Sequence, residues 1–245
     1  MGDSVGVSLG QGGDNSTSTL GPCVVIGDSP FWLVNFHPLE DAALQRTEGA
    51  IDLVLDHPSP DDRSVCRHSR HEIFQGTSRT LPWASNPYWI EAGLDAQTGV
   101  GEGPKDPIDS ISTVFSGAPV HSTGRTSGLQ RGSVCLSPEV VSPKINGTGK
   151  LTREWFVEEP YPYDDEIGWT TSGIGVSGDS GAAIVDSEND ALCGQLWGRN
   201  IYEKSQSGPR ITYFTPITDI FDDIQEKYSG SSRPELPLWK GKEIS

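Results

Sequence analysis

The stretch Gly173-Ile-Gly-Val-Ser-Gly-Asp-Ser-Gly-Ala-Ala-Ile-Val-Asp186 sets the interpretation of the whole chain. At its centre, Gly178-Asp-Ser-Gly181 surrounds one hydroxyl with small residues, and the apolar run 182–185 follows directly. Glycines permit a sharp turn, and an apolar run of this length predicts a buried strand. Glycines also let backbone N–H groups approach a developing negative charge. The stretch therefore predicts either a plain Gly/Ser/Asp turn before a strand or a nucleophilic serine on such a turn.

Two other segments favour the nucleophile. Upstream, residues 24–37 contain two strand-like runs around a turn, and the second run ends at His37. Downstream, the apolar run 192–198 ends in Trp197-Gly198. A serine nucleophile needs a base, and histidine has the pKa that suits this role. His37 is therefore the candidate base, although a histidine at a strand end can also be purely structural.

These residues make the chain similar to the chymotrypsin-like (trypsin-like) serine peptidases. In that family a Gly-Asp-Ser-Gly motif carries the nucleophile, and the catalytic histidine ends a strand of the first barrel. The local sequence, including Gly124-Arg-Thr-Ser-Gly128, is similar to a group of intracellular fungal proteins with this fold. The resemblance implies an all-β fold of two six-stranded antiparallel β-barrels with a C-terminal helix.

The expected organisation follows from composition and from this resemblance. The Gly/Ser/Thr-rich start of the chain predicts a flexible segment, and apolar residues at helical spacing after Thr218, a candidate N-cap, predict the C-terminal helix. The expected segments are a flexible N-terminal segment (1–20), a first barrel with His37 (21–117), a second barrel with Ser180 and the helix (118–228) and a loose tail (229–245).

The resemblance also implies a mechanism. Ser180 attacks a peptide carbonyl while His37 takes its proton, and the backbone N–H groups of Gly178 and Ser180 hold the oxyanion. Ile174 stands where the family places the base of the substrate pocket, and Trp197-Gly198 form one wall. Because no carboxylate stands at that base, we expect cleavage beside neutral or apolar side chains; preferred cleavage after arginine would contradict this.

The acid of the expected triad has no single candidate. Asp52 begins an apolar run but lies only fifteen residues after His37, and Asp95, Asp106 and Asp109 are followed by residues that do not start a strand. Loss of this acid can cost roughly 10⁴ in kcat. Two functions therefore stay open: a serine endopeptidase, or a peptidase-like module that binds a peptide or a partner protein without turnover. An esterase is disfavoured because the Gly-x-Ser-x-Gly elbow is missing.

Composition narrows the partners. The 245 residues carry a net charge of −16, which disfavours nucleic acid as a partner because phosphate binding needs a basic patch. No apolar run approaches the roughly 20 residues that span a bilayer, and the start of the chain lacks the features of a signal peptide. We therefore expect an intracellular protein that acts on peptides or proteins, away from membranes.

Metals, cofactors and disulfides are not expected either. His68, His71 and Glu72 resemble part of a metal site but lack a third well-placed ligand. The proposed acyl transfer needs no cofactor. The four cysteines, which are scattered and form no C-x-x-C pair, are expected to be free, buried thiols: Cys23, Cys66, Cys135 and Cys193.

Overall fold

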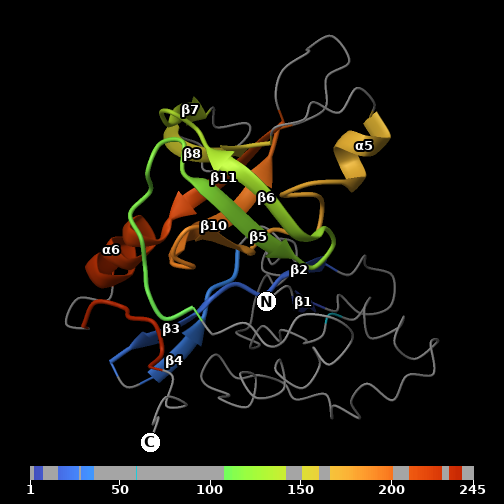
Figure 1. Cartoon of the computed structure of the whole chain (residues 1–245). Coiled ribbons are helices and arrows are strands. Elements are labelled where there is room, and N and C mark those ends of the chain that lie inside the picture. The colour runs from blue at the N-terminus through green and yellow to red at the C-terminus, as the bar shows by residue number, and fades with distance from the viewer. Residues whose placement is uncertain are drawn as a thin grey trace, which may run out of the picture.

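Figure 1 shows the computed structural model of the chain. It describes residues 3–7, 16–27, 29–35, 59, 108–141, 151–159, 166–200, 210–227 and 232–238. The described part is mainly β. His37 and most of the segment expected to form the first barrel, 21–117, lie outside the described residues.

A closed antiparallel barrel dominates the described part (Figure 1). Its six strands are β5 (Pro119–Gly124), β6 (Gly128–Val134), β8 (Thr152–Glu158), β9 (Ala183–Asp186), β10 (Leu192–Arg199) and β11 (Ile211–Pro216). They follow one another in the order β11-β10-β9-β5-β6-β8, and pairing of β11 with β8 closes the ring. A short strand, β7 (Glu139–Val141), pairs with β8. With the terminal helix described below, this barrel confirms the predicted fold class.

Strand β9, which follows Ser180 directly, joins two hydrophobic cores. All four of its residues are buried. Because side chains alternate along a strand, Ile184 packs into the barrel interior while Ala183 and Val185 face the opposite side. That second side packs against the C-terminal helix α6 (Ile217–Lys227) and against Val24. The apolar run after the serine is therefore buried on both faces, as the sequence predicted.

Helix α6 begins one residue before the expected N-cap. Thr218 lies inside its first turn, and its hydroxyl contacts the Asp219 carboxylate at 3.3 Å. The expectation that Thr218 caps the helix is therefore wrong. The physical reason is burial: Ile217 is fully buried and Phe221 nearly so, and these two side chains, one turn apart, fix the start of the helix against the core.

The N-terminal residues form strands. β1 (Ser4–Val7) pairs antiparallel with β2 (Ser16–Thr19), and β3 (Cys23–Ile26) pairs with β4 (Ser29–Trp32). The first hairpin contradicts our expectation of a flexible segment at 1–20, at least for the described residues of that range. Buried Val5 and buried Ser and Thr side chains tie this hairpin to the rest of the protein. The second hairpin confirms the strand-turn-strand pattern predicted before His37.

The tail also corrects an expectation, that residues 229–245 are loose. Glu235 exchanges two backbone hydrogen bonds with Val25 of β3, at 2.7 and 2.9 Å, and Ser232 accepts a hydrogen bond from the Gly27 N–H at 3.0 Å. Leu236 packs against the core shared by β3 and α6. The described tail residues, 232–238, therefore extend the β3–β4 hairpin.

A short helix, α5 (Glu166–Thr171), lies between β8 and the turn that carries Ser180. Trp169 is its buried residue and donates a hydrogen bond from its ring N–H to the Asn200 carbonyl at 3.2 Å. This contact attaches α5 to the end of β10. Neither α5 nor α6, the helices of the described part, has the length and hydropathy of a membrane-spanning segment.

The described cysteines carry free thiols, and their burial leads to a first prediction. Burial raises the pKa of Cys23 and of Cys193 to about 11 from 9.0. Because the thiolate is the reactive form, this shift lowers its amount near neutral pH by roughly 100-fold. We expect an aromatic disulfide reagent to modify both residues at least ~100-fold more slowly in the native protein than in urea, as followed by peptide mass mapping. Equal native and denatured rates would contradict this burial.

Candidate active site

Ser180 lies on a tight turn between residues 176 and 182, ahead of β9. The Asp179 N–H donates to the Val176 carbonyl and the Ala182 N–H to the Asp179 carbonyl, each at 2.9 Å. Gly178 and Gly181 flank the pair Asp179-Ser180 with φ angles of 97° and 99°. L-residues with side chains rarely adopt such angles, so this turn requires glycine at both positions.

The turn directs the Ser180 N–H outward. The Asp179 carbonyl points to the Ala182 N–H inside the turn. In a planar trans peptide the N–H points opposite to the carbonyl, so the Ser180 N–H faces away from Ala182. The Ser180 side chain is half-buried, and its Oγ lies 3.5 Å from the Trp197 carbonyl oxygen. Ser180 is therefore held on a turn whose N–H faces away from Ala182, and its hydroxyl lies close to β10.

Asp179 has a structural position behind the serine. Its side chain is only 1% exposed, and Oδ1 accepts hydrogen bonds from the backbone N–H groups of Thr126 and Ser127, at 3.0 and 3.1 Å. A Cβ on Gly124 would overlap this carboxylate. The segment 124–128, singled out from the sequence only by resemblance, therefore acts as the support for Asp179. The sequence contained no local signal for this pairing.

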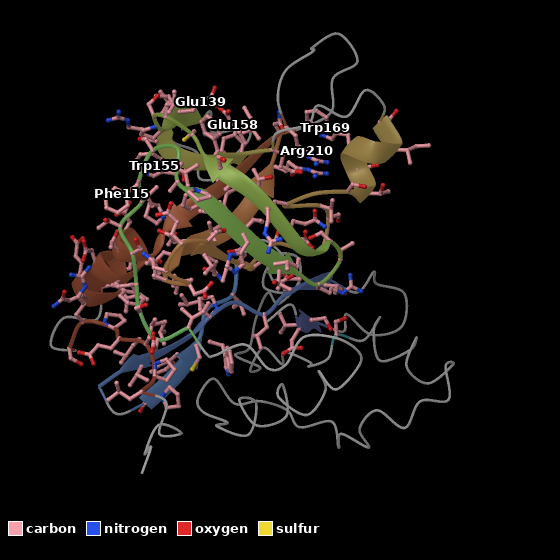
Figure 2. The ribbon with its side chains drawn as sticks, in the orientation of Figure 1. Phe115, Glu139, Trp155, Glu158, Trp169 and Arg210 are labelled. Atoms are coloured by element: carbon pink, nitrogen blue, oxygen red, sulfur yellow. The ribbon has the colours of Figure 1, made fainter. Side chains whose placement is uncertain are left out.

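A buried ion pair supports the segment before the turn. Arg210 is 0% exposed and donates to the Glu159 carboxylate and to the Ser172 carbonyl. The other Glu159 oxygen accepts the Ile174 N–H at 2.8 Å. Gly173 fits between them, since a Cβ there would overlap both charged groups. Figure 2 shows Arg210 beside Trp169, on the side of the barrel where α5 lies.

Burial and pairing act in opposite directions on Glu159. Burial raises the pKa of its carboxyl, while the hydrogen bond and the charge of Arg210 oppose that rise. The carboxylate is therefore stabilised at neutral pH mainly by its guanidinium partner. Sequence analysis assigned no role to either residue, because they lie 51 positions apart and neither belongs to a recognisable motif.

A second guanidinium binds the same segment. Arg199, at the end of β10, donates to the Ser172 carbonyl at 2.9 Å, to the Ile174 carbonyl at 3.4 Å and to the Trp169 carbonyl. Thr212 adds a hydroxyl hydrogen bond to the Ile174 carbonyl at 2.7 Å. The backbone of 172–174 is therefore held by charged and hydroxyl donors from β10 and β11.

The three residues expected in the substrate pocket lie in two environments. Trp197 is half-buried and stacks on Tyr213, with ring centroids 5.1 Å apart and 13° between the planes. Gly198 borders open space, since no atom lies within 4 Å of a Cβ built there. Ile174 is 1% exposed and belongs to the barrel core. The structure thus brings Trp197 and Gly198 next to Ser180 and places the Ile174 side chain among core residues.

The candidate base, His37, lies outside the described residues. Asn35, two positions before it, contacts β10. The Asn35 side-chain amide donates to the Leu196 carbonyl at 2.7 Å. The same carbonyl accepts the Gly181 N–H at 2.8 Å. One oxygen of β10 therefore binds both the residue after Ser180 and the residue two positions before His37.

The other sequence-predicted groups are mostly outside the described part. Of the carboxylates considered for the triad, Asp109 is described and is exposed; Asp52, Asp95 and Asp106 lie outside. The run 67–72, considered as a partial metal site, also lies outside. Within the described ranges, no three His, Cys, Asp or Glu side chains gather as metal ligands would.

The chain matches no protein-family model and no curated protein. Among solved structures it is similar to a glutamic-acid-specific serine protease described as using a histidine triad in substrate binding, at 14% identity and a TM-score of 0.48, over 95% of this chain and 97% of that one. It is also similar to a Nocardiopsis protease, at 12% identity and a TM-score of 0.47, over 91% and 94%. Because both identities and both TM-scores are low, these similarities do not assign a function to the chain.

Proposed function

We propose that the protein is a serine endopeptidase in which Ser180 is the nucleophile and His37 the general base. The observation that carries this proposal is the shared contact at the Leu196 carbonyl, which binds Gly181 and Asn35 together. Because two residues of chain span at most about 7 Å, the contact of Asn35 supports a His37 that reaches the turn carrying Ser180. The motif supports Ser180 as the nucleophile, and the contact of Asn35 supports His37 as its base.

The proposed reaction is acyl transfer in two steps. Ser180 Oγ attacks the peptide carbonyl as His37 accepts the hydroxyl proton, and that proton passes to the leaving amine. Water then attacks the acyl-enzyme with His37 again acting as base, which releases the acid and regenerates the serine. The N–H groups of Gly178 and Ser180 would hold the oxyanion in both steps, each worth about 3–4 kcal/mol of transition-state stabilisation.

The wall formed by Trp197 and Gly198 supports an apolar or neutral substrate side chain. One face of the Trp197 ring stacks on Tyr213, and Gly198 borders open space that a substrate side chain could occupy. Ile174, expected from the sequence at the base of the pocket, could contribute only its backbone there, because its side chain belongs to the core. The narrower resemblance to intracellular fungal members stays a prediction from sequence.

Labelling with a fluorophosphonate tests the proposal. The reagent is expected to modify wild-type protein at Ser180 and to leave Ser180→Ala unmodified, as shown by peptide mapping. His37→Ala should slow labelling at least ~10³-fold, because the hydroxyl loses its base. Ser177→Ala is the matched control: it removes an exposed serine three residues away and should label at the wild-type rate.

Each variant must first show a wild-type circular dichroism spectrum and unfolding midpoint. Folded wild-type protein that takes no label would refute the endopeptidase and favour the alternative, a module that binds a peptide or partner protein without turnover. Labelling that persists in His37→Ala would refute the assignment of the base while leaving Ser180 as nucleophile.

A further inference from the structure

Two adjacent residues of β2, Ser18 and Thr19, bind the backbone of the turn 176–182 that carries Ser180 (the serine turn). The Thr19 N–H donates to the Ser180 carbonyl at 2.9 Å, and the Ser18 hydroxyl donates to the same oxygen. The Thr19 hydroxyl donates to the Gly178 carbonyl at 2.8 Å. Both side chains are buried, Thr19 completely. Three donors from the N-terminal hairpin therefore hold two of the four carbonyls in Gly178-Asp-Ser-Gly181.

The Thr19 hydroxyl also connects the serine turn to its second support. It accepts a hydrogen bond from the Arg125 N–H at 3.0 Å while it donates to Gly178. Arg125 begins the turn whose next two N–H groups hold the Asp179 carboxylate. One buried hydroxyl thus lies between β2, the 125–127 turn and the turn that carries Ser180.

The glycines of the motif make this contact necessary. A residue without a side chain can adopt several backbone conformations, so an external contact must select one of them. At Gly178 the Thr19 hydroxyl provides that contact through the carbonyl. At Gly181 the absence of a side chain lets β2 approach, since a Cβ there would overlap the Thr19 carbonyl oxygen.

We propose that Ser18 and Thr19 are positioning residues: by binding the Gly178 and Ser180 carbonyls, they hold Ser180 and the peptide that carries its N–H in the orientation needed for catalysis. This inference rests on the proposed function, because the Asp179–Ser180 peptide, which carries the Ser180 N–H proposed to bind the oxyanion, lies between the two peptide planes whose carbonyls are held. The hairpin β1–β2 is then part of the active-site machinery, although it lies about 160 positions away in sequence.

Variants at Thr19 and at a packing residue of the same hairpin test the proposal. Thr19→Val keeps the shape and removes the hydroxyl, while Thr19→Ser keeps the hydroxyl and removes the methyl group. Val5→Ala removes buried packing from β1 opposite Ser18 and leaves every hydroxyl contact in place. Two quantities are measured for each: the rate of fluorophosphonate labelling at Ser180 and hydrogen exchange of the amides in 176–182.

We expect Thr19→Val to slow labelling roughly 10- to 100-fold, the range expected for losing a buried hydrogen bond, and to speed amide exchange in 176–182. Thr19→Ser should restore both values to near wild type, and Val5→Ala should lower the unfolding midpoint without slowing labelling comparably. Ser18→Ala should slow labelling less than Thr19→Val does, because the Thr19 N–H still binds the Ser180 carbonyl. This variant replaces Thr19→Val in the test if Thr19→Val does not fold.

Three results would overturn the positioning role: unchanged labelling and exchange in Thr19→Val, no rescue by Thr19→Ser, or an equal loss in Val5→Ala. If folded wild-type protein takes no label, the endopeptidase proposal fails separately. The exchange measurement then decides the inference alone: faster exchange in Thr19→Val with rescue by Thr19→Ser supports it, and unchanged exchange refutes it.

Discussion

Replacing Arg210 by methionine is expected to lower the free energy of unfolding by roughly 3–5 kcal/mol at neutral pH. The Arg210 side chain is fully buried and that of Glu159 is 7% exposed, so the substitution leaves a buried carboxylate without its guanidinium partner. The Ser172 carbonyl loses a donor as well. Urea denaturation of the two proteins measures the difference directly, and a loss below about 1 kcal/mol would contradict the buried pair.

The loss should depend on pH in a definite direction. Burial raises the pKa of Glu159 and Arg210 opposes the rise, so in Arg210→Met the folded-state pKa rises further. A carboxyl with a raised folded pKa contributes its full stability below its unfolded pKa, about 4.3, and loses it as pH rises through the folded pKa. The gap in stability between wild type and Arg210→Met should therefore be smaller near pH 4 than near pH 7.

Two further variants separate the ion pair from general effects of removing an arginine. Glu159→Gln combined with Arg210→Met removes both charges and should cost less than Arg210→Met alone. Arg199→Met removes a guanidinium that binds backbone carbonyls of the same segment. Its charge lowers the pKa of Glu159 less than Arg210 does, so this variant should destabilise with a weaker pH dependence. A double variant as unstable as Arg210→Met at pH 7 would show that packing, and not the unpaired charge, dominates.

Replacing Gly181 by alanine is expected to abolish fluorophosphonate labelling of Ser180. Gly181 has a φ of 99°, which costs an L-residue roughly 1–3 kcal/mol. The added Cβ would also overlap the Thr19 carbonyl oxygen, a backbone atom of β2 that a rotamer change cannot move. Either the hairpin separates from the serine turn or the turn changes shape, and both displace the Ser180 hydroxyl. Labelling rate and unfolding midpoint are the two measurements.

Gly198→Ala is the matched control for this substitution. A Cβ at Gly198 meets no atom within 4 Å, and Gly198 is not among the described residues with positive φ. We expect its stability to stay within about 0.5 kcal/mol of wild type. Equal losses of stability in the two variants would contradict the close approach of β2 to Gly181.

Local sequence patterns predicted the elements whose residues carry a recognisable periodicity or apolar run. The apolar run 182–185 became β9, and the run 192–198 became β10, because buried strands are recognisable from consecutive apolar residues. Helical spacing likewise predicted α6, although it placed the start of the helix after Thr218 and α6 begins at Ile217. The turn at Ser180 was recognised from its glycines, which the observed positive φ angles require.

The supports of the site were not predictable in the same way. The N-terminal hairpin has few apolar residues, and its order comes from hydroxyl contacts with a turn about 160 residues later. Glu159 and Arg210 are likewise separated in sequence and meet only because β8 and β11 pair to close the barrel. Contacts of this kind form only when distant segments come together in the tertiary structure, so no local pattern of residue types predicts them.

The central claim is that the imidazole of His37 serves the hydroxyl of Ser180. An experimental structure that resolves both side chains tests this claim most directly, through the distance between Ser180 Oγ and the nearer ring nitrogen of His37. We expect a distance of about 3 Å, within hydrogen-bond reach. A separation beyond about 6 Å, with the serine turn itself as described here, would contradict it.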